Sequence, residues 1–260
     1  MNDLYKLKAS PVALEKNTVV KNNCRITLLT GRLLRFEFSE SGIFENRATQ
    51  KVLNRDFEPV DFKISESEEE TVIETDSLKI VWNGRPFSSE NLTLETKGFG
   101  IWHYGERTEN LKGTRRTLDG IDGPCALEDG LLSRGGFTLL DDSSSLVITD
   151  DGWVAVRDNP ESDIYFFGYG HDYLGCLHDF YRLCGKTPML PRYTLGNWWS
   201  RYYQYTEKTY KELMERFDKE QVPLTVAVVD MDWHWVDIDP KYGSGWTGYS
   251  WNTDFFPDPD

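Results

Sequence analysis

Two short stretches of the sequence concentrate the side chains that could do chemistry. Arg201 and Tyr202 follow one expected strand, and residues 230–235 follow another with two aspartates, two tryptophans, a methionine and a histidine. Carboxylates accept hydrogen bonds from hydroxyl groups, and indole and phenol rings offer flat apolar faces to a sugar ring. The residue types therefore favour a site for a saccharide. The candidate residues at these two strand ends are Arg201, Tyr202, Asp230, Met231, Asp232 and Trp233.

The elements that must position these side chains are a strand, a helix and a second strand. Residues 195–200 predict the first strand, and residues 224–229 form an apolar run typical of a parallel strand buried on both faces. Thr206 is the expected N-cap of the helix, which ends before Pro223. This order predicts a right-handed βαβ unit, and such units bind ligands at the C-terminal ends of their strands. The apolar face of the helix, at i, i+3, i+4 and i+7, consists of Tyr210, Leu213, Met214 and Phe217.

A simpler interpretation is open for the same residues. Asp230 could cap the loop that follows it, and the tryptophans could belong to a hydrophobic core. Six of the nine tryptophans lie between residues 198 and 251, which fits either a ring-binding surface or a dense core. We interpret His234 as a hydrogen-bonding neighbour rather than as a catalytic base.

The sequence before residue 168 has the pattern of an antiparallel β-sandwich. Short segments of alternating polarity recur every 8 to 12 residues or so and are joined by turn residues. Residues 98–134 interrupt them with seven glycines and little alternation, which indicates a functional or mobile loop. The expected strands are residues 26–29, 33–38, 70–75, 78–82, 91–96, 137–140, 146–149, 153–156 and 164–167.

A helix over residues 171–184 is expected to close this first region. Its expected apolar face is formed by Tyr173, Leu174, Leu177, Phe180 and Tyr181, flanked by two cysteines that we interpret as buried small apolar residues. We therefore expect two domains, a sandwich over residues 1–185 and an α/β segment over residues 186–260.

Composition excludes several classes of function. The net charge of −14 disfavours binding to nucleic acid or to an anionic membrane, and no apolar run approaches the roughly 18 residues of a spanning helix. The first residues carry no secretory signal, so we expect a cytoplasmic protein with four free thiols. No CxxC or HExxH spacing occurs, and we expect neither a metal nor a cofactor.

Several spaced motifs resemble glycoside hydrolase family 31, the family of α-glucosidases and α-xylosidases. The resemblance runs from about residue 98 onward and implies a β-sandwich followed by the start of a (β/α)8 TIM barrel, reaching about two strands. The motifs are residues 104–107, 113–120, 131–136, 195–202, 222–224, 229–233, 245–252 and 256–259.

The resemblance also implies roles for individual residues. Asp230 would hold the sugar in the −1 subsite with Met231 as an apolar wall, and Tyr202 beside Arg201 would lie near the +1 subsite. The loop of residues 98–134 would reach toward the barrel and contribute an aspartate, either Asp122 or, as the second choice, Asp119.

The sequence departs from the family in one important respect. Retaining glycosidases need two carboxylates about 5–5.5 Å apart, and in the family both lie on later barrel strands than those found here. Asp230 and Asp232 are separated by about 7 Å in an extended segment and are not aimed across one bond. We therefore expect an N-terminal fragment of an α-glycosidase acting on terminal α-linked glucose or xylose, without hydrolytic activity of its own. Neither catalytic carboxylate is expected before residue 260.

Two strands of a barrel would leave an open sheet edge and an uncovered apolar face. We expect a dimer mate or the remainder of the barrel to cover them. Two other functions remain open at this point: a non-catalytic carbohydrate-binding sandwich with a short α/β tail, and an α-glucan lyase on the same scaffold. The expected partner is a small-molecule oligosaccharide substrate.

Overall fold

The computed structural model describes residues 7–158 and 161–259. The chain divides into two compact units, Met1–Thr187 and Pro188–Asp260. Each unit is described by itself, beginning with the first.

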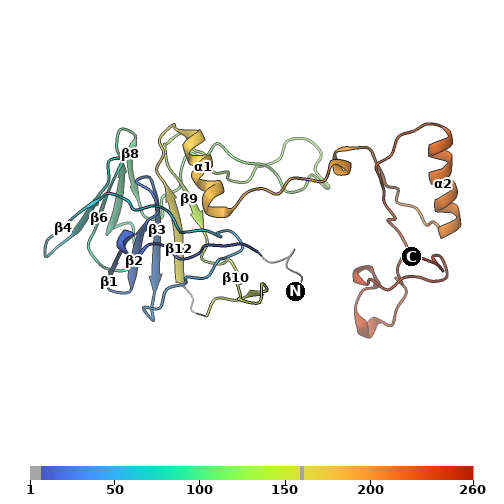
Figure 1. Cartoon of the computed structure of the whole chain (residues 1–260), viewed down its shortest axis with the longest axis horizontal. Coiled ribbons are helices and arrows are strands. Elements are labelled where there is room, and N and C mark those ends of the chain that lie inside the picture. Colours follow the sequence, from blue (N-terminus) through green and yellow to red (C-terminus); the bar gives the residue numbers. More distant parts are fainter. Residues whose placement is uncertain (1–6, 159–160, 260) are drawn as a thin grey trace. The chain divides into compact units, whose positions relative to one another are not determined.

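Unit 1 contains two five-stranded antiparallel sheets, which confirms the expectation of mostly antiparallel structure. The first has the order β1-β2-β3-β12-β9 and the second the order β4-β5-β6-β7-β8 (Figure 1). A separate hairpin pairs β10 with β11. The strands are β1 Thr18–Lys21, β2 Cys24–Leu28, β3 Leu33–Ser39, β4 Lys63–Glu66, β5 Thr71–Glu74, β6 Leu78–Trp82, β7 Leu92–Thr96, β8 Gly100–His103, β9 Thr138–Asp141, β10 Val147–Ile148, β11 Val154–Ala155 and β12 Glu161–Phe167.

One apolar core joins the two sheets. Alternate residues of β5, β6 and β7 are buried, as a strand with one covered face requires. They pack with residues of β2, β3 and β12 from the other sheet, an arrangement typical of a β-sandwich. The central side chains of this core are Ile26, Phe36, Ile80, Trp82, Leu94, Trp102 and Phe166.

The opposite face of the first sheet buries a network of charges. Arg35 donates to both carboxylate oxygens of Asp163 at 2.8 and 2.7 Å and lies 3.0 Å from Glu37. Arg157 bridges Asp163 and Asp142 at 3.0 and 3.2 Å. All five side chains are at most 5% exposed, and their pairing satisfies charges that would otherwise be costly to bury.

Helix α1, Tyr173–Cys184, begins where Asp172 accepts a hydrogen bond from the Gly175 amide. The apolar face predicted for this helix is partly wrong, because Leu174 is 81% exposed and Tyr181 is 45% exposed. The helix is instead rotated so that the row at i, i+4 and i+7 faces the core. The side chains that pack there are Cys176, Phe180, Leu183 and Cys184.

Three strands of unit 1 are missing from the sequence prediction. β1 and β4 lie at sheet edges, and all four residues of β4 are exposed, so neither carries strong alternation. β8 lies inside the segment interpreted as a loop and pairs with β7 through Leu94 and Trp102. The expected loop of residues 98–134 therefore begins as a strand of the second sheet.

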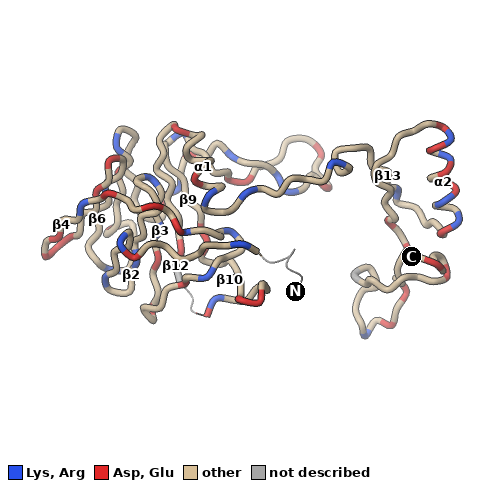
Figure 2. Tube along the Cα trace, in the orientation of Figure 1, with Lys and Arg blue, Asp and Glu red and all other residues tan. Residues whose placement is uncertain are grey.

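Unit 2 is built from a short parallel pair and one helix. Trp198 pairs with Val226 and Trp199 with Ala227, so β13, Trp198–Trp199, and β14, Val226–Ala227, are parallel. Helix α2, Glu207–Lys219, connects them, and Figure 2 shows charges of both signs along it. Short 3-10 turns cover Arg192–Leu195, Pro240–Tyr242 and Gly245–Thr247. In the described ranges, no helix combines the length and apolarity needed to cross a membrane.

The expected burial of the second parallel strand on both faces is wrong. Val226 is half-buried and Ala227 is exposed, and both strands are shorter than predicted. Among the described residues, β14 pairs only with β13, so a continuous apolar run has no second neighbour to bury its other side.

Candidate functional site

The ends of the two parallel strands run side by side. The amide of Val228 donates to the Trp199 carbonyl at 2.9 Å, beyond the pairs of the short ladder. Farther along, Gln204 and Met231 form an isolated parallel bridge. The segments that follow β13 and β14 therefore lie together, as the βαβ pattern predicts.

Helix α2 holds this arrangement from one side. Thr206 caps it, and its hydroxyl accepts from the Thr209 amide while the Thr209 hydroxyl accepts from the Thr206 amide. The Tyr210 hydroxyl donates to the Val228 carbonyl at 2.8 Å, and the Phe217 ring meets the Trp199 ring edge-on at 4.8 Å. The predicted N-cap and apolar face of this helix are confirmed.

The two aspartates after β14 have different surroundings. Asp230 is exposed, whereas Asp232 is 8% exposed and has a backbone φ of 56°. The Asp232 carboxylate accepts a hydrogen bond of 2.9 Å from the Gln204 side chain. An aspartate tolerates this left-handed conformation better than most residues, and the bond fixes where its carboxylate points. Asp230 is thus the carboxylate that is open to a ligand, and Met231 between them is half-buried.

The arginine and tyrosine after β13 are both exposed. Tyr202 is 80% exposed and offers a free ring face. The Arg201 guanidinium lies 4.4 Å from the centre of the Tyr203 ring, a cation–π contact that the sequence did not predict. Arg201 is therefore positioned by Tyr203, and Tyr202 remains available for stacking.

A second backbone pairing lies after β14, between residues 231–235 and residues 249–252. We call these two segments together the aromatic ribbon. The Asn252 amide donates to the Trp233 carbonyl at 2.8 Å, and the Trp235 amide donates to the Ser250 carbonyl at 3.1 Å. Gly245 permits the intervening turn, because a Cβ there would lie 2.2 Å from the Val236 carbonyl oxygen. The Trp233 ring meets the rings of His234, Trp251 and Tyr249 at 4.7, 5.0 and 6.1 Å.

The two predicted arm carboxylates belong to unit 1. We define the arm as residues 109–134, which follow β8. Near its base, Asn110 and Ser133 form an isolated antiparallel bridge. Asp119 and Asp122 are both exposed within it. The structure therefore brings Arg201, Tyr202 and residues 230–233 into one neighbourhood in unit 2, while Asp119 and Asp122 are exposed in the arm of unit 1.

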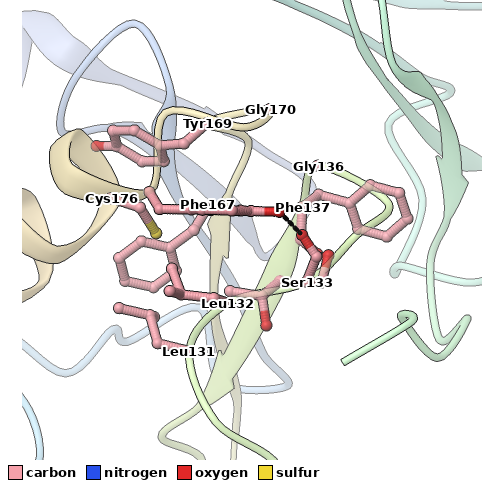
Figure 3. Close-up of a pocket in the computed structure, with 11 residues that line it drawn as sticks. Leu131, Leu132, Ser133, Gly136, Phe137, Phe167, Tyr169, Gly170 and Cys176 are labelled. Carbon is pink, nitrogen blue, oxygen red and sulfur yellow. Dashed lines mark hydrogen bonds between the residues drawn. The ribbon is translucent and has the colours of Figure 1, made fainter. Parts of the chain in front are cut away.

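A small pocket of unit 1 is not this site. It measures about 10 Å3, enough for one water molecule at most, and is lined by Phe137, Phe167 and Tyr169 beside Cys176 (Figure 3). A larger open groove of about 650 Å3 in unit 2 runs along the start of α2 and includes Glu207, Lys211 and Asp254, none of them predicted site residues. In the part of the chain that the structure describes, no three His, Cys, Asp or Glu side chains are placed to hold a metal ion.

Sequence reasoning missed several residues that shape the site. Gln204 holds Asp232, and Tyr203 holds Arg201. His234 was not missed, since the sequence predicts it as a hydrogen-bonding neighbour; it is 5% exposed, and its Nδ1 atom has no hydrogen-bond partner among the described residues. Asn252 is 6% exposed and its backbone pairs with Trp233. Only Asn252 had a signal, since it ends one of the spaced motifs; the partners of Asp232 and Arg201 depend on contacts that one sequence does not display.

The model of the TIM-barrel domain of glycosyl hydrolases family 31 matches residues 187–260. This range contains the parallel pair, α2 and the aromatic ribbon.

Solved structures with a similar fold belong to the same family. A GH31 dextranase of Flavobacterium johnsoniae, complexed with glucose, is 16% identical to this chain with a TM-score of 0.56. The match covers 96% of this chain and 36% of the dextranase chain. A GH31 α-xylosidase from a soil metagenome, complexed with xylose, is 15% identical with a TM-score of 0.59, and covers 96% of this chain and 44% of its own. A GH31 α-xylosidase from Xanthomonas citri is 11% identical with a TM-score of 0.56, and covers 95% of this chain and 47% of its own.

These likenesses concern the fold, and the chain spans less than half the length of these three structures. The family model and the shared fold confirm the resemblance that the motifs carry. Residues 187–260 therefore resemble the TIM-barrel domain of glycosyl hydrolases family 31.

Proposed function

We propose that this chain is the N-terminal part of a retaining α-glycosidase that acts on terminal α-linked glucose or xylose in oligosaccharides. Unit 1 is its β-sandwich, and unit 2 is the beginning of its (β/α)8 barrel. The observation that carries the proposal is the convergence of Asp230 and Tyr202 at the ends of two parallel strands within the segment that matches family 31. The family-31 neighbours complexed with glucose and xylose support a saccharide ligand.

The proposed roles follow from the surroundings of each side chain. Asp230 is exposed and accepts hydrogen bonds from sugar hydroxyls, while half-buried Met231 forms an apolar wall. Tyr202, with 80% of its surface exposed, stacks on the neighbouring sugar. Asp232 already accepts from Gln204 and so positions the strand end more than it binds the ligand. Trp233 supports the same end through the aromatic ribbon.

We assign neither the nucleophile nor the acid/base to these 260 residues. A retaining mechanism needs two carboxylates about 5–5.5 Å apart that both face the scissile bond. Asp230 is exposed, but Asp232 is turned into the protein with a positive φ and engaged by Gln204. The proposal therefore predicts saccharide binding without bond cleavage.

Titration of the full 260-residue chain with glucose, xylose and isomaltotriose tests this function, together with an assay for hydrolysis of an aryl α-glucoside. We expect saturable binding, at least a tenfold loss of affinity in Asp230→Asn, and no turnover. Asp237→Asn, an exposed aspartate beyond the ribbon, is the matched control and should bind normally. Binding that survives both Asp230→Asn and Tyr202→Ala would assign the sugar to the sandwich instead, and turnover would contradict the missing catalytic pair.

A further inference from the structure

The register of the parallel pair in unit 2 changes along its length. In the short ladder Trp199 pairs with Ala227, but farther along Gln204 pairs with Met231. The segment between these two pairings, residues 200–203, is therefore one residue longer than the segment opposite it. An extra residue on one side of a paired segment bends that side and turns its side chains in a new direction. We call residues 200–203 the bulge.

The bulge carries the exposed side chains that follow β13. Arg201 and Tyr203 form a cation–π contact at 4.4 Å, and Tyr202 between them is 80% exposed. On the opposite segment Asp230 is the exposed residue. The extra residue thus lies in the part of unit 2 to which the proposed function assigns the saccharide.

Gln204 ends the bulge through two contacts with the opposite segment. Its backbone pairs with Met231, and its side-chain amide donates to the Asp232 carboxylate at 2.9 Å. Met231 and Asp232 directly follow Asp230 in the sequence. The two contacts therefore hold the backbone that carries Asp230 against the end of the bulge.

The backbone conformation of Asp232 makes this support important. Its φ of 56° is left-handed, and residues other than glycine occupy this region at an energetic cost. Such a conformation persists where surrounding contacts determine it. The Asp232 side chain is also in a residue that is only 8% exposed, so loss of the Gln204 donor would deprive a largely buried carboxylate of a hydrogen bond. The bond from Gln204 therefore stabilises both the left-handed turn and the carboxylate.

We propose that Gln204 is a positioning residue for saccharide binding: by holding Asp232 in its left-handed turn, it fixes the direction of Asp230 before the ligand arrives. This inference rests on the proposed function, in which Asp230 contacts the sugar. A carboxylate on a preformed segment binds hydroxyl groups without the loss of affinity that ordering the segment would cause. In this role Gln204 acts through Asp232 and does not itself contact the sugar.

Gln204→Leu tests the proposal in the full 260-residue chain, with isomaltotriose as the probe. Leucine is of similar size but has no donor, so we expect Asp232 to leave its left-handed conformation more often and the affinity to fall about fivefold. The backbone pairing with Met231 does not depend on the side chain and should persist. Exchange of the Tyr210 amide, which donates to the Thr206 carbonyl at 2.9 Å, reports whether unit 2 remains folded.

Gln204→Glu adds a readout that a merely structural role would not move. At about pH 7.5 the glutamate and Asp232 would face each other with like charges, and we expect the affinity to fall about tenfold or more. Near about pH 5 the two carboxyls share one proton and the hydrogen bond reforms, so the affinity should return to within about twofold of that of the unaltered chain. Comparison with the unaltered chain at each pH cancels the titration of the other groups around this pair, which are Arg201 and Tyr203 of the bulge, Asp230 and His234 on the opposite segment, and Tyr210 of α2.

Asn197→Ala is the matched control. The Asn197 side chain also joins the two parallel segments, because it donates to the Pro223 carbonyl at 3.0 Å, but it does so at the other end of the ladder. This variant should bind isomaltotriose normally at both pH values. A loss equal to that of Gln204→Leu would show that any weakened connection between the segments lowers affinity, and it would overturn the specific role of Gln204.

The possible failures are distinguishable. Unchanged affinity in Gln204→Leu, while Asp230→Asn weakens binding, would overturn the positioning role alone. The same follows if the affinity of Gln204→Glu does not recover as the pH falls, or if both variants lose affinity together with faster exchange of the Tyr210 amide. If the unaltered chain binds no isomaltotriose, or if Asp230→Asn binds normally, the proposed function fails and the positioning role fails with it.

Discussion

The two units of this chain differ in how much of their apolar surface they bury. Unit 1 closes ten strands around a shared apolar core and pairs its buried charges within one network. In unit 2 the buried apolar side chains, among the described residues, are Tyr205, Tyr210 and Phe256. Several of its aromatic rings are more than half exposed: Tyr193, Trp198, Tyr202, Tyr242, Trp246 and Tyr249.

Both units bury polar atoms without a hydrogen-bond partner among the described residues: Arg55 Nη2, Thr96 Oγ1 and Ser145 Oγ in unit 1, and as many in unit 2, which is less than half as long. Unit 2 buries Trp199 Nε1, Tyr205 Oη and His234 Nδ1 without a hydrogen-bond partner within the described part of the chain. Unsatisfied buried groups each cost about 1–3 kcal/mol. The comparison teaches that unit 1 is stabilised from within, whereas unit 2 has the composition of a surface that contacts something else. We infer that a saccharide and further protein surface supply those contacts.

The largest expected effect is on the charge network of unit 1. Arg35→Met leaves Asp163 and Glu37 buried without their main partner, and loss of one partner of a buried pair costs about 3–5 kcal/mol. Urea unfolding followed by circular dichroism measures the loss. Lys21→Met removes a partly exposed pair with Glu66 at 3.7 Å and should cost less than about 1 kcal/mol. Equal effects of the two substitutions would contradict the internal stabilisation of unit 1.

The next largest expected effect is a difference between the two units in the rate of amide hydrogen exchange. The amides that pair β12 with β3 lie in the core sheet, whereas the Val228 amide pairs in a ladder with one neighbour. We expect the Val228 amide to exchange about a hundredfold or more faster than the Phe166 amide, since local opening of unit 2 exposes little apolar surface. Similar protection of both amides in a dilute monomer would refute the contrast.

Acid should weaken unit 1 through Asp163. Burial alone would raise the pKa of this carboxyl, but the charges and hydrogen bonds of Arg35, with Arg55 and Arg157 nearby, lower the pKa to about 2. A lowered pKa contributes stability that is present above the unfolded value near 4 and is lost as the pH falls toward 2, amounting to about 2 kcal/mol. Unfolding free energies measured between pH 5 and pH 2 should show this loss.

The pKa of Asp142 shifts in the opposite direction to that of Asp163, which helps to separate their contributions. Burial, and then the neighbouring charge of Asp163, raise the pKa of Asp142, so its protonation favours the folded state as the pH falls. Asp163→Asn should therefore reduce the acid-induced loss, and it also removes one of the causes that raise the pKa of Asp142. An acid-induced loss of the same size in Asp163→Asn would place its origin in other carboxyls of unit 1, such as Glu45, whose pKa is lowered by its hydrogen bond with Arg47.

The smallest expected effect concerns the helix that supports the site. Thr206→Ala removes the N-cap of α2 and one half of its capping box, which should destabilise the helix by about 1 kcal/mol. Amide exchange within α2 should rise while exchange in the core of unit 1 stays constant. Lys208→Ala, in the same turn, removes only an exposed pair with Glu212 at 3.8 Å and serves as the control.

The elements with strong periodicity were predictable from the sequence, and those fixed by tertiary contacts were not. Alternation identified β3, β6 and β7, and the i, i+3, i+4, i+7 spacing identified the buried face of α2. β8 was missed because its exposed residues Gly100 and Ile101 carry no alternation. Helix α1 is apolar on several sides, so spacing alone did not decide which side meets the sheet.

The candidate site shows the same division. The strand-end positions of Asp230 and Arg201 follow from the order of strand, helix and strand. The partners of Arg201 and Asp232 do not follow from it: Tyr203 is two residues from Arg201, whereas Gln204 is 28 residues from Asp232. Asn110, whose side chain bonds to the backbone of Gly130 as a paired strand residue would, lay in a segment interpreted as a loop, because such a side chain has no periodic signature.

The central claim is that the saccharide binds at the strand ends of unit 2 and not on the sandwich. Indole N–H resonances of the tryptophans, recorded by NMR during titration with isomaltotriose, test it most directly. We predict saturable shifts for Trp233 and Trp251 of the aromatic ribbon and no shift for Trp82 and Trp102 in the core of unit 1. Shifts confined to Trp153, which is 67% exposed on the sandwich, or no shift at any tryptophan, would contradict the account.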